Sequence, residues 1–515
     1  MPYPRVMRSW RIWNVAIGIA MAMLIGANAQ QIARPILTPA PGPEPAIHGP
    51  RVYGARPGRP FLYRIPSTGL RPIRFSATGL PPSLQLDPAT GIVTGNSPRQ
   101  AGEYSITFQA ANAKGKSSRA FKLVVGDTLA LTPPMGWNDW YSHYNRITSK
   151  LMCQAADTLV ASGMADFGYQ YVNIDDCWMV KRDPASGEEP RTREGTIRPN
   201  RDFPDMNALT AYIHGKGLKA GIYTSPGPLT CAGYEGAYQH EEADARQFAA
   251  WGFDFLKYDW CSYGKIARDN SLEEAQKPYR KMGDLVHHLD RDVVFNLCQY
   301  GRNEVWKWGG DVGGQSWRTT GDLGMEKDTD LPGFYSIAFK DAEHFEYARP
   351  GRWNDPDYIL IGYVGDAHRN DAPPQPTKLN AEEQYSYMSL WALMASPLIY
   401  SGDMAHLDKF TLNVLCNAEV IDLDQDPLGR QARVVRKTSD EFILAKPLND
   451  GSLAVGLFNL TNAARTIDAG WVDLHLQGTQ LARDVWRHQN IGNASGHYSA
   501  TVGPHGVSLV RLLRH

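Results

Sequence analysis

A regular alternation of apolar strand-like runs with amphipathic helical stretches, over residues 131–424, restricts the possible folds of this chain more than any other feature. Within one helical stretch Leu151, Ala155 and Leu159 recur at a spacing of four residues and are followed by Gly163. Alternating strands and helices build parallel sheets whose faces the helices cover. The region therefore predicts an α/β fold, and its length favours a (β/α)8 TIM barrel.

Eight candidate strands can be read along this region. They are 134–137, 169–175, 218–223, 253–259, 293–298, 317–322, 352–357 and 397–402. The alternative is an open, doubly wound sheet, but no glycine-rich phosphate-binding fingerprint follows the first strand. The barrel is therefore the preferred prediction.

The other segments differ from this region in composition, which divides the 515 residues into five parts. Short alternating strands, as at Tyr104, Ile106 and Phe108, predict a small β-sandwich upstream. Downstream, the helical periodicity stops and Asp450-Gly451 marks a hairpin turn. The predicted parts are a signal peptide (1–29), a Pro-rich linker (30–48), an Ig-like β-sandwich module (49–127), the barrel (128–427) and a C-terminal antiparallel β-sandwich domain (428–515).

The N-terminus has the features of an export signal. Arginines at 5, 8 and 11 precede an apolar run over 15–25, and Ala27-Asn28-Ala29 has the small residues of a cleavage site. The run is short for a bilayer span, although an uncleaved anchor is the alternative. We expect cleavage after Ala29 and a periplasmic or secreted protein, with no membrane association after signal removal.

Composition and motifs exclude several classes of function. The formal net charge is −1 and no basic stripe stands out, so we expect no nucleic-acid partner. None of the six cysteines forms a CxxC pair, and no HExxH, EF-hand or Walker pattern is present. The sequence therefore predicts neither a metal nor another cofactor.

The candidate site begins with Lys257 and Asp259, which stand two residues apart at the end of an apolar strand and so share one side. The alternative for such a pair is a surface ion pair. In a barrel, however, the C-terminal ends of all strands face one pocket. The residues that the predicted strands bring there are Trp137, Asp175, Asp176, Tyr223, Lys257, Asp259, Gln299, Arg318, Asp322, Asp355 and Asp357.

This mixture of carboxylates and aromatic rings is typical of sugar-binding sites. Carboxylates accept hydrogen bonds from hydroxyl groups, and aromatic faces cover the apolar side of a pyranose ring. Two carboxylates can also cleave a glycoside, one as nucleophile and one as proton donor. The residues alone do not decide whether Asp322, Asp355 or Asp357 is the second carboxylate.

Residues 131–430 resemble the melibiase-type α-galactosidases of glycoside hydrolase family 27. The matching motifs are Pro-Met-Gly-Trp at 134–137, Ile-Asp-Asp-Cys-Trp at 174–178, Gly-Leu-Lys-Ala-Gly-Ile-Tyr at 217–223, Thr-Cys-Ala-Gly-Tyr at 230–234, Leu-Lys-Tyr-Asp-Trp-Cys at 256–261, Trp-Asn-Asp-Pro-Asp at 353–357 and Asp-Gln-Asp-Pro-Leu-Gly at 424–429. The segment 79–95 resembles Ig-like modules of secreted bacterial enzymes, for which a spacer role and carbohydrate binding are both open. The family resemblance implies a barrel followed by an antiparallel β-domain, hydrolysis with retention of configuration, and no metal.

The resemblance also implies residue roles. Asp259 matches the family's nucleophile and Asp322 its acid/base, with the two carboxyl groups expected about 5 to 6 Å apart. Lys257 is expected to keep Asp259 ionised by lowering its pKa. Cys231 and Cys261 match a family disulfide. The predicted substrate-binding residues are Trp137, Asp175, Asp176, Tyr223, Lys257, Gln299, Arg318 and Asp357.

Some positions depart from the family pattern. Many members have Cys-Glu-Trp where this chain has Cys-Gln-Tyr at 298–300, in a loop that faces the C2 substituent of the sugar, and Tyr358 stands where methionine is common. Cys177 and Cys298 are expected to be buried thiols. The predicted activity is release of terminal α-D-galactose from oligo- or polysaccharides. The alternatives are an α-N-acetylgalactosaminide, a β-L-arabinopyranoside or an α-glucan as substrate, or a non-catalytic glycan-binding protein.

Overall fold

The computed structural model describes residues 34–185, 187–323, 331–365 and 373–514. The predicted signal peptide, with its cleavage position after Ala29, lies outside these residues. Within the described ranges, no helix has both the length and the apolar character that a bilayer span requires.

Residues 135–400 form the predicted barrel, with all eight strands parallel to their neighbours. In chain order the strands are β10 (Met135–Asn138), β11 (Tyr171–Asn173), β12 (Lys219–Thr224), β13 (Phe255–Asp259), β14 (Val294–Cys298), β15 (Ser316–Arg318), β16 (Trp353–Asp355) and β19 (Leu398–Tyr400). From β10 to β16 each strand pairs with the next, β19 pairs with β10, and a parallel bridge from Ile359 to Tyr400 joins the two ends of the sheet. The sequence prediction of the fold is confirmed.

Four of the six main helices between the strands begin at a side-chain cap. The six are α2 (Ser149–Ala161), α3 (Met206–Gly215), α4 (Glu241–Trp251), α5 (Leu272–His287), α7 (Gly333–Ala342) and α8 (Ala381–Leu393). Thr148 and Asp205 each accept a hydrogen bond from a backbone N–H of the first turn of α2 and α3. Of the three apolar residues spaced four apart in α2, Ala155 and Leu159 are buried, whereas Leu151 is only partly buried.

Several strands are shorter than predicted at their C-terminal ends. The sixth was expected to run to residue 322, but β15 ends at Arg318, and the seventh ends at Asp355 rather than 357. Asp357 has a positive φ of 93°, which an extended strand cannot contain. Asp322 and Asp357 therefore lie in the loops that follow their strands.

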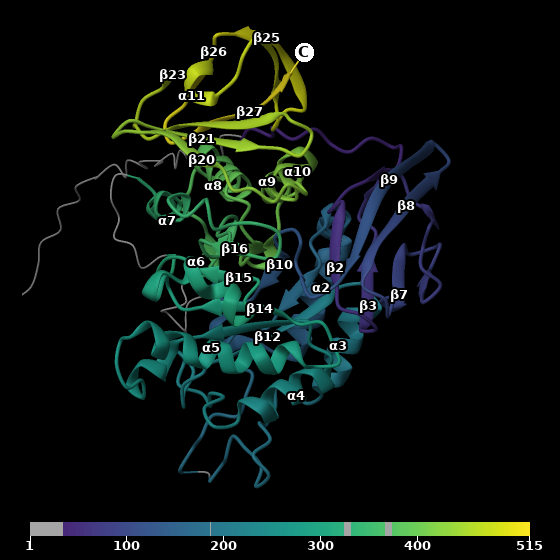
Figure 1. Cartoon of the computed structure of the whole chain (residues 1–515), viewed down its shortest axis with the longest axis vertical. Helices are drawn as coiled ribbons and strands as arrows, with labels where there is room; N and C mark the ends of the chain where they lie inside the picture. Colours follow the sequence, from purple (N-terminus) through teal and green to yellow (C-terminus); the bar gives the residue numbers. More distant parts are fainter. Residues whose placement is uncertain (1–33, 186, 324–330, 366–372, 515) are drawn as a thin grey trace, which may run out of the picture. The chain divides into compact units, whose positions relative to one another are not determined.

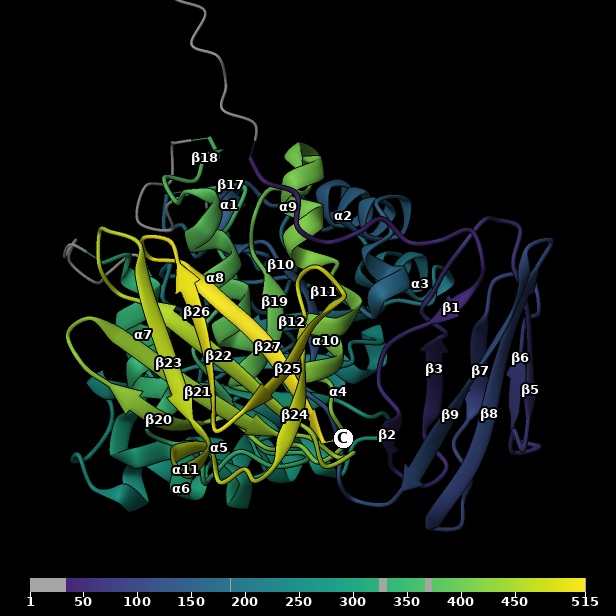
Figure 2. The same cartoon turned by 90° about the horizontal axis from the view of Figure 1, so that it is seen from above.

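Two larger sheets form most of the N-terminal β-rich module. One contains β2 (Val52–Ala55), β9 (Gly115–Val125), β8 (Gly102–Asn112) and β5 (Arg74–Thr78), and the other contains β3 (Pro60–Arg64), β7 (Ile92–Asn96) and β6 (Leu84–Leu86), as Figure 2 shows. Phe108 and Phe121 meet Tyr63 between them. In residues 49–127, all of which are described, every aromatic side chain is buried or half-buried. The module therefore presents no exposed aromatic platform of the kind that covers a sugar ring.

The module contacts the N-terminal ends of the barrel strands. The Tyr53 hydroxyl pairs with Lys219 Nζ at the start of β12, and the Arg56 N–H donates to Asp292 just before β14. These contacts lie at the barrel end opposite to the predicted site.

The C-terminal domain is antiparallel. Its six-stranded sheet has the order β20 (Arg433–Lys437), β21 (Glu441–Pro447), β22 (Leu453–Asn459), β27 (Val507–Arg514), β24 (Thr479–Asp484) and β25 (Gln489–Ser495), and β23 (Arg465–Gly470) pairs with β26 (His497–Val502). The predicted hairpin turn is confirmed, with Gly451 at a φ of 82° between β21 and β22. Helix α8 packs against β22 and β27. Figure 1 shows it next to β20, at the edge of the C-terminal domain.

Candidate active site

Lys257 and Asp259, at the C-terminal end of β13, are buried inside the barrel. Their exposed fractions are 7% and 4%, which excludes the alternative of a surface ion pair. A buried charge is tolerated only where partners compensate for its desolvation. The partners of these two side chains therefore define the site.

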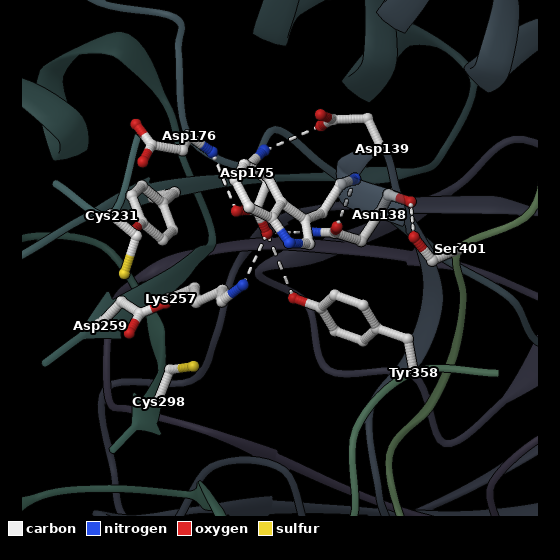
Figure 3. A network of polar contacts seen from close by, with 12 residues as sticks. Asn138, Asp139, Asp175, Asp176, Cys231, Lys257, Asp259, Cys298, Tyr358 and Ser401 are labelled. Atoms are coloured by element: carbon white, nitrogen blue, oxygen red, sulfur yellow. Dashed lines mark hydrogen bonds and ion pairs between the residues drawn. The ribbon is translucent and has the colours of Figure 1, made fainter. Parts of the chain in front are cut away.

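Asp175 is the direct partner of Lys257. Its Oδ2 accepts hydrogen bonds from Lys257 Nζ at 2.8 Å, from the Asn138 amide at 2.9 Å and from the Tyr358 hydroxyl at 3.3 Å, while its own N–H donates to Asp139 (Figure 3). Burial alone would lower the pKa of Lys257, but nearby carboxylates, Asp175 first, raise it well above its usual value. Lys257 is thus held as a cation in the floor of the site.

Asp259 carries a carboxylate whose pKa is raised, not lowered. Burial raises its pKa to about 6, against the opposing effects of the Lys257 cation and of a hydrogen bond of 2.5 Å from the Tyr300 hydroxyl to Oδ1. Lys257 does lower the pKa of Asp259, as expected, but desolvation outweighs this attraction, so the net shift is upward.

Arg318, at the end of β15, joins the two loop carboxylates. Its Nη2 lies 3.1 Å from Asp322 Oδ1 and 3.1 Å from Asp357 Oδ2, and Asp357 also accepts a hydrogen bond of 2.7 Å from the Tyr141 hydroxyl. The Asp322 side chain is 27% exposed, whereas that of Asp357 is 1% exposed. Asp322 is therefore the member of this pair that solvent or a ligand can reach.

The predicted disulfide between Cys231 and Cys261 is present, with Cα atoms 4.8 Å apart. The Tyr223 hydroxyl lies 3.2 Å from Cys261 Sγ. In the described residues, Cys231, Asp259 and Cys261 are the one group with the spacing of metal ligands. The disulfide leaves this group without a thiolate, so it is unsuited to hold a soft metal ion.

Asp176 lies beside Asp175 and faces the loop after β12. Its Oδ2 accepts a hydrogen bond of 2.8 Å from the Ala232 N–H, and burial raises its pKa to about 7. Its neighbour Cys177 is a buried free thiol, as is Cys298, which confirms both predictions.

Trp137 and Gln299 are both buried. The Trp137 indole donates a hydrogen bond of 2.8 Å to the Gly402 carbonyl, so its N–H is already satisfied. Gln299 is 1% exposed, and neither polar atom of its side-chain amide has a hydrogen-bond partner in the structure. Both polar atoms of this buried amide are therefore available to bind water or a polar ligand.

The structure also brings in residues that the sequence prediction passed over. Asn138 and Asp139 directly follow Trp137 at the end of the first strand, so the rule that located Asp175 could have located them. The sequence identifies Tyr358 and Tyr300 only as departures from a family pattern. Their hydroxyls now contact Asp175 and Asp259, which no strand rule predicts because both residues lie in loops.

Comparison with known proteins places this arrangement in a family. The family model described as "Alpha galactosidase A" (Melibiase_2) matches residues 132–426, and the model of the alpha galactosidase C-terminal beta sandwich domain matches 440–512. A model of Ig domains matches residues 44–126. The chain belongs to the melibiase-type α-galactosidases of glycoside hydrolase family 27.

Individual relatives agree with this assignment. Alpha-galactosidase 2 of Arabidopsis thaliana is 37% identical over 76% of this chain and 92% of its own length, and alpha-galactosidase A of Cellvibrio japonicus is 35% identical over 75% and 93%. The crystal structure of alpha-galactosidase I from Mortierella vinacea superposes with a TM-score of 0.67 at 29% identity, covering 75% of this chain and 98% of that one. A structure of a candidate α-galactosidase/melibiase from Bacteroides fragilis covers 93% of this chain and 99% of that one, with a TM-score of 0.84 at 35% identity. The enzyme is thus a glycoside hydrolase of the α-galactosidase type.

Proposed function

We propose that the enzyme releases terminal α-D-galactose from oligo- and polysaccharides by double displacement, with Asp259 as nucleophile and Asp322 as acid/base. The observation that carries this proposal is the arrangement at the ends of β13 and β15. Asp259 is buried beside a fixed cation, and Asp322 is partly exposed and paired with Arg318. One carboxylate is thus shielded from water and the other can exchange protons with it, as the two roles require.

In the first step a lone pair of Asp259 forms a bond to the anomeric carbon, and the bond from that carbon to the leaving oxygen breaks. Asp322 donates its proton to the leaving oxygen, so no alkoxide is released. In the second step Asp322 takes a proton from water, whose oxygen attacks the anomeric carbon, and the Asp259 carboxylate leaves. Two inversions at one carbon give net retention.

The sugar would be held by groups already in place around Asp259. We assign Asp175, Asp176, Lys257, Asp357 and Arg318 to its hydroxyl groups, Trp137 and Tyr223 to the walls, and Gln299 to the loop beside C2. A yeast relative from Saccharomyces cerevisiae was solved with raffinose, which is an oligosaccharide ligand of the proposed class. A structural neighbour from Geobacillus stearothermophilus, a β-L-arabinopyranosidase, shares the fold at 22% identity, and β-L-arabinopyranoside is one of the competing substrates.

A panel of nitrophenyl glycosides tests the sugar, and NMR of the first product tests the stereochemistry. We expect α-D-galactoside to be cleaved with the highest kcat/KM, ahead of the α-N-acetylgalactosaminide, β-L-arabinopyranoside and α-glucoside. Proton NMR early in the reaction should show the α anomer of galactose before mutarotation. A β anomer as first product would contradict double displacement, and preference for another sugar would contradict the assigned specificity.

The pKa of Asp259 predicts an acidic limit to activity. Asp259 must be ionised to attack, and its pKa is raised to about 6, so kcat/KM should fall as pH decreases through about 6. Well below that point the loss approaches about tenfold for each pH unit. The measurement is kcat/KM for nitrophenyl α-D-galactoside between about pH 4 and 8. A limb near pH 4, where an ordinary aspartate titrates, would contradict the assigned burial effect.

We further propose that the mature protein is exported. The disulfide between Cys231 and Cys261 lies in the wall of the site, and such bonds persist in oxidising compartments. N-terminal sequencing of the protein recovered from outside the cytoplasm should begin at residue 30, and recovery of a chain that retains residues 1–29 would contradict the cleavage.

A further inference from the structure

Tyr300 lies in the loop that follows β14, and its side chain contacts the nucleophile. The hydroxyl donates a hydrogen bond to Asp259 Oδ1 at 2.5 Å and lies 3.6 Å from Cys231 Sγ. The Arg318 guanidinium lies 5.8 Å from the centre of the Tyr300 ring. Tyr300 therefore contacts Asp259 directly. It also lies beside Arg318, which forms an ion pair with Asp322.

The backbone that carries Tyr300 is held in an uncommon conformation. Tyr300 has a φ of 64°, a region that bulky side chains seldom adopt, and Gly301 follows with a φ of 81°. The Gly301 N–H donates to the Arg318 carbonyl at 3.0 Å, and a Cβ at Gly301 would lie 2.3 Å from the Thr319 carbonyl oxygen. The loop is thus fixed against the end of β15, which is how a disfavoured conformation persists at a functional site.

We propose that Tyr300 is a positioning residue for the nucleophile, whose hydroxyl fixes Asp259 Oδ1 and leaves Oδ2 as the attacking oxygen. This inference rests on the proposed role of Asp259. When Oδ2 bonds to the anomeric carbon, Oδ1 becomes the carbonyl oxygen of the ester and still accepts the hydrogen bond. When the ester is cleaved, the electron pair of the C1–Oδ2 bond returns to the carboxylate, where a hydrogen bond to the charged form is stronger. Tyr300 keeps its proton throughout.

The residue type at position 300 matters because the contact to Asp259 is made by a phenol hydroxyl group, which phenylalanine and methionine lack. Burial, with Asp259 as the next contribution, raises the pKa of Tyr300 well above its usual value, so the phenol remains a donor over the working pH range.

The charge state of Asp259 depends on its whole surroundings. The groups that act on it or face it are Lys257 on the same strand, Asp175 after β11, Tyr223 on β12, Cys298 on β14, Tyr279 on α5, Tyr300, and Asp322 after β15. Of these, Lys257 and Tyr300 favour the ionised form and oppose the effect of burial. Loss of the Tyr300 hydroxyl should therefore raise the pKa of Asp259 further.

The test compares Tyr300→Phe and Tyr300→Met with Tyr263→Phe by the pH profile of kcat/KM on nitrophenyl α-D-galactoside. Tyr263 is a matched control, because its hydroxyl donates to the Glu274 carboxylate at 3.1 Å and it is not among the groups that shift the pKa of Asp259. Both Tyr300 variants should lose roughly 10- to 100-fold in kcat/KM at neutral pH. Their acid limb should move to higher pH by about one unit, because a hydrogen bond to a charged group is lost. Tyr263→Phe should leave the limb in place.

The position of the acid limb does not depend on how much of a variant is folded, so it is decisive even for a poorly stable protein. An unmoved limb in both Tyr300 variants would overturn the inference, whatever the loss of rate. A limb that moves with Met but not with Phe would overturn it too, because that pattern follows the ring and not the hydroxyl. Hydrolysis by Asp259→Asn would instead overturn the proposed nucleophile, so the two failures are distinguishable.

Discussion

Asp259→Asn should abolish turnover while leaving the protein folded and able to bind galactose. Removal of a nucleophile leaves only positioning and electrostatic effects, so we expect kcat to fall on the order of 10⁴-fold or more. The amide keeps the shape of the carboxylate and can still accept the Tyr300 hydrogen bond. Burial raises the pKa of Asp259, which means that the ionised form is the less well tolerated one in the folded state. At neutral pH the neutral variant should therefore be at least as heat-stable as the parent.

The measurements are kcat on nitrophenyl α-D-galactoside, the Kd for galactose by calorimetry, and thermal unfolding. Asp341→Asn is the matched control, because burial also raises the pKa of Asp341, to about 7, yet its carboxylate contacts Thr319 and Gln431 instead of the reacting groups. It should keep most of the activity. If Asp259→Asn also kept most of the parent's activity, as Asp341→Asn should, Asp259 would not be the nucleophile.

An external nucleophile gives a sharper test of the same role. In Asp259→Ala the missing carboxylate leaves space on the face from which it attacks. Azide can enter there and displace the leaving group in one inversion, so the expected product is β-galactosyl azide. Recovery of the α azide from this variant would show that a covalent intermediate still forms on another residue.

The fold was predictable because its signal is spread over many residues. Eight apolar runs alternate with helical stretches, and the barrel has strands at all eight positions. The ends of the strands were less predictable. Arg318 and Asp355 end their strands, and the positive φ of Asp357 is a local conformation that apolar periodicity does not encode.

The sequence could predict only those site residues that the order of the strands brings close together. The strand-end rule and the family resemblance brought Asp175, Lys257 and Asp259 together, and the structure does the same. The direction in which the pKa of Asp259 shifts was not predictable, because it depends on how much water the folded chain excludes. Tyr300 was missed as a partner for a similar reason, since its contact with Asp259 requires a loop with positive φ.

Asp322→Ala should give losses that depend on the leaving group, which a purely structural role would not produce. Natural oligosaccharides need a proton on the leaving oxygen, so their kcat/KM should fall by about 10² to 10⁴-fold. Nitrophenolate leaves without full protonation, so the first step on nitrophenyl α-D-galactoside should be affected less. The second step still lacks its base, and the covalent intermediate should therefore accumulate and be detectable by mass spectrometry of the intact protein.

Azide should rescue the second step of Asp322→Ala, because an anion attacks without a base. It would attack the galactosyl-enzyme on Asp259, and two inversions give α-galactosyl azide, the opposite anomer to that expected from Asp259→Ala. Asp440→Ala is the matched control, since Asp440 forms an exposed ion pair of 3.1 Å with Arg465 in the C-terminal domain, equal in length to that of Asp322 with Arg318. An equal loss of kcat/KM on oligosaccharide and nitrophenyl substrates, with no azide product, would show that another carboxylate is the acid/base. Asp357, which also pairs with Arg318, would then be the first residue to substitute.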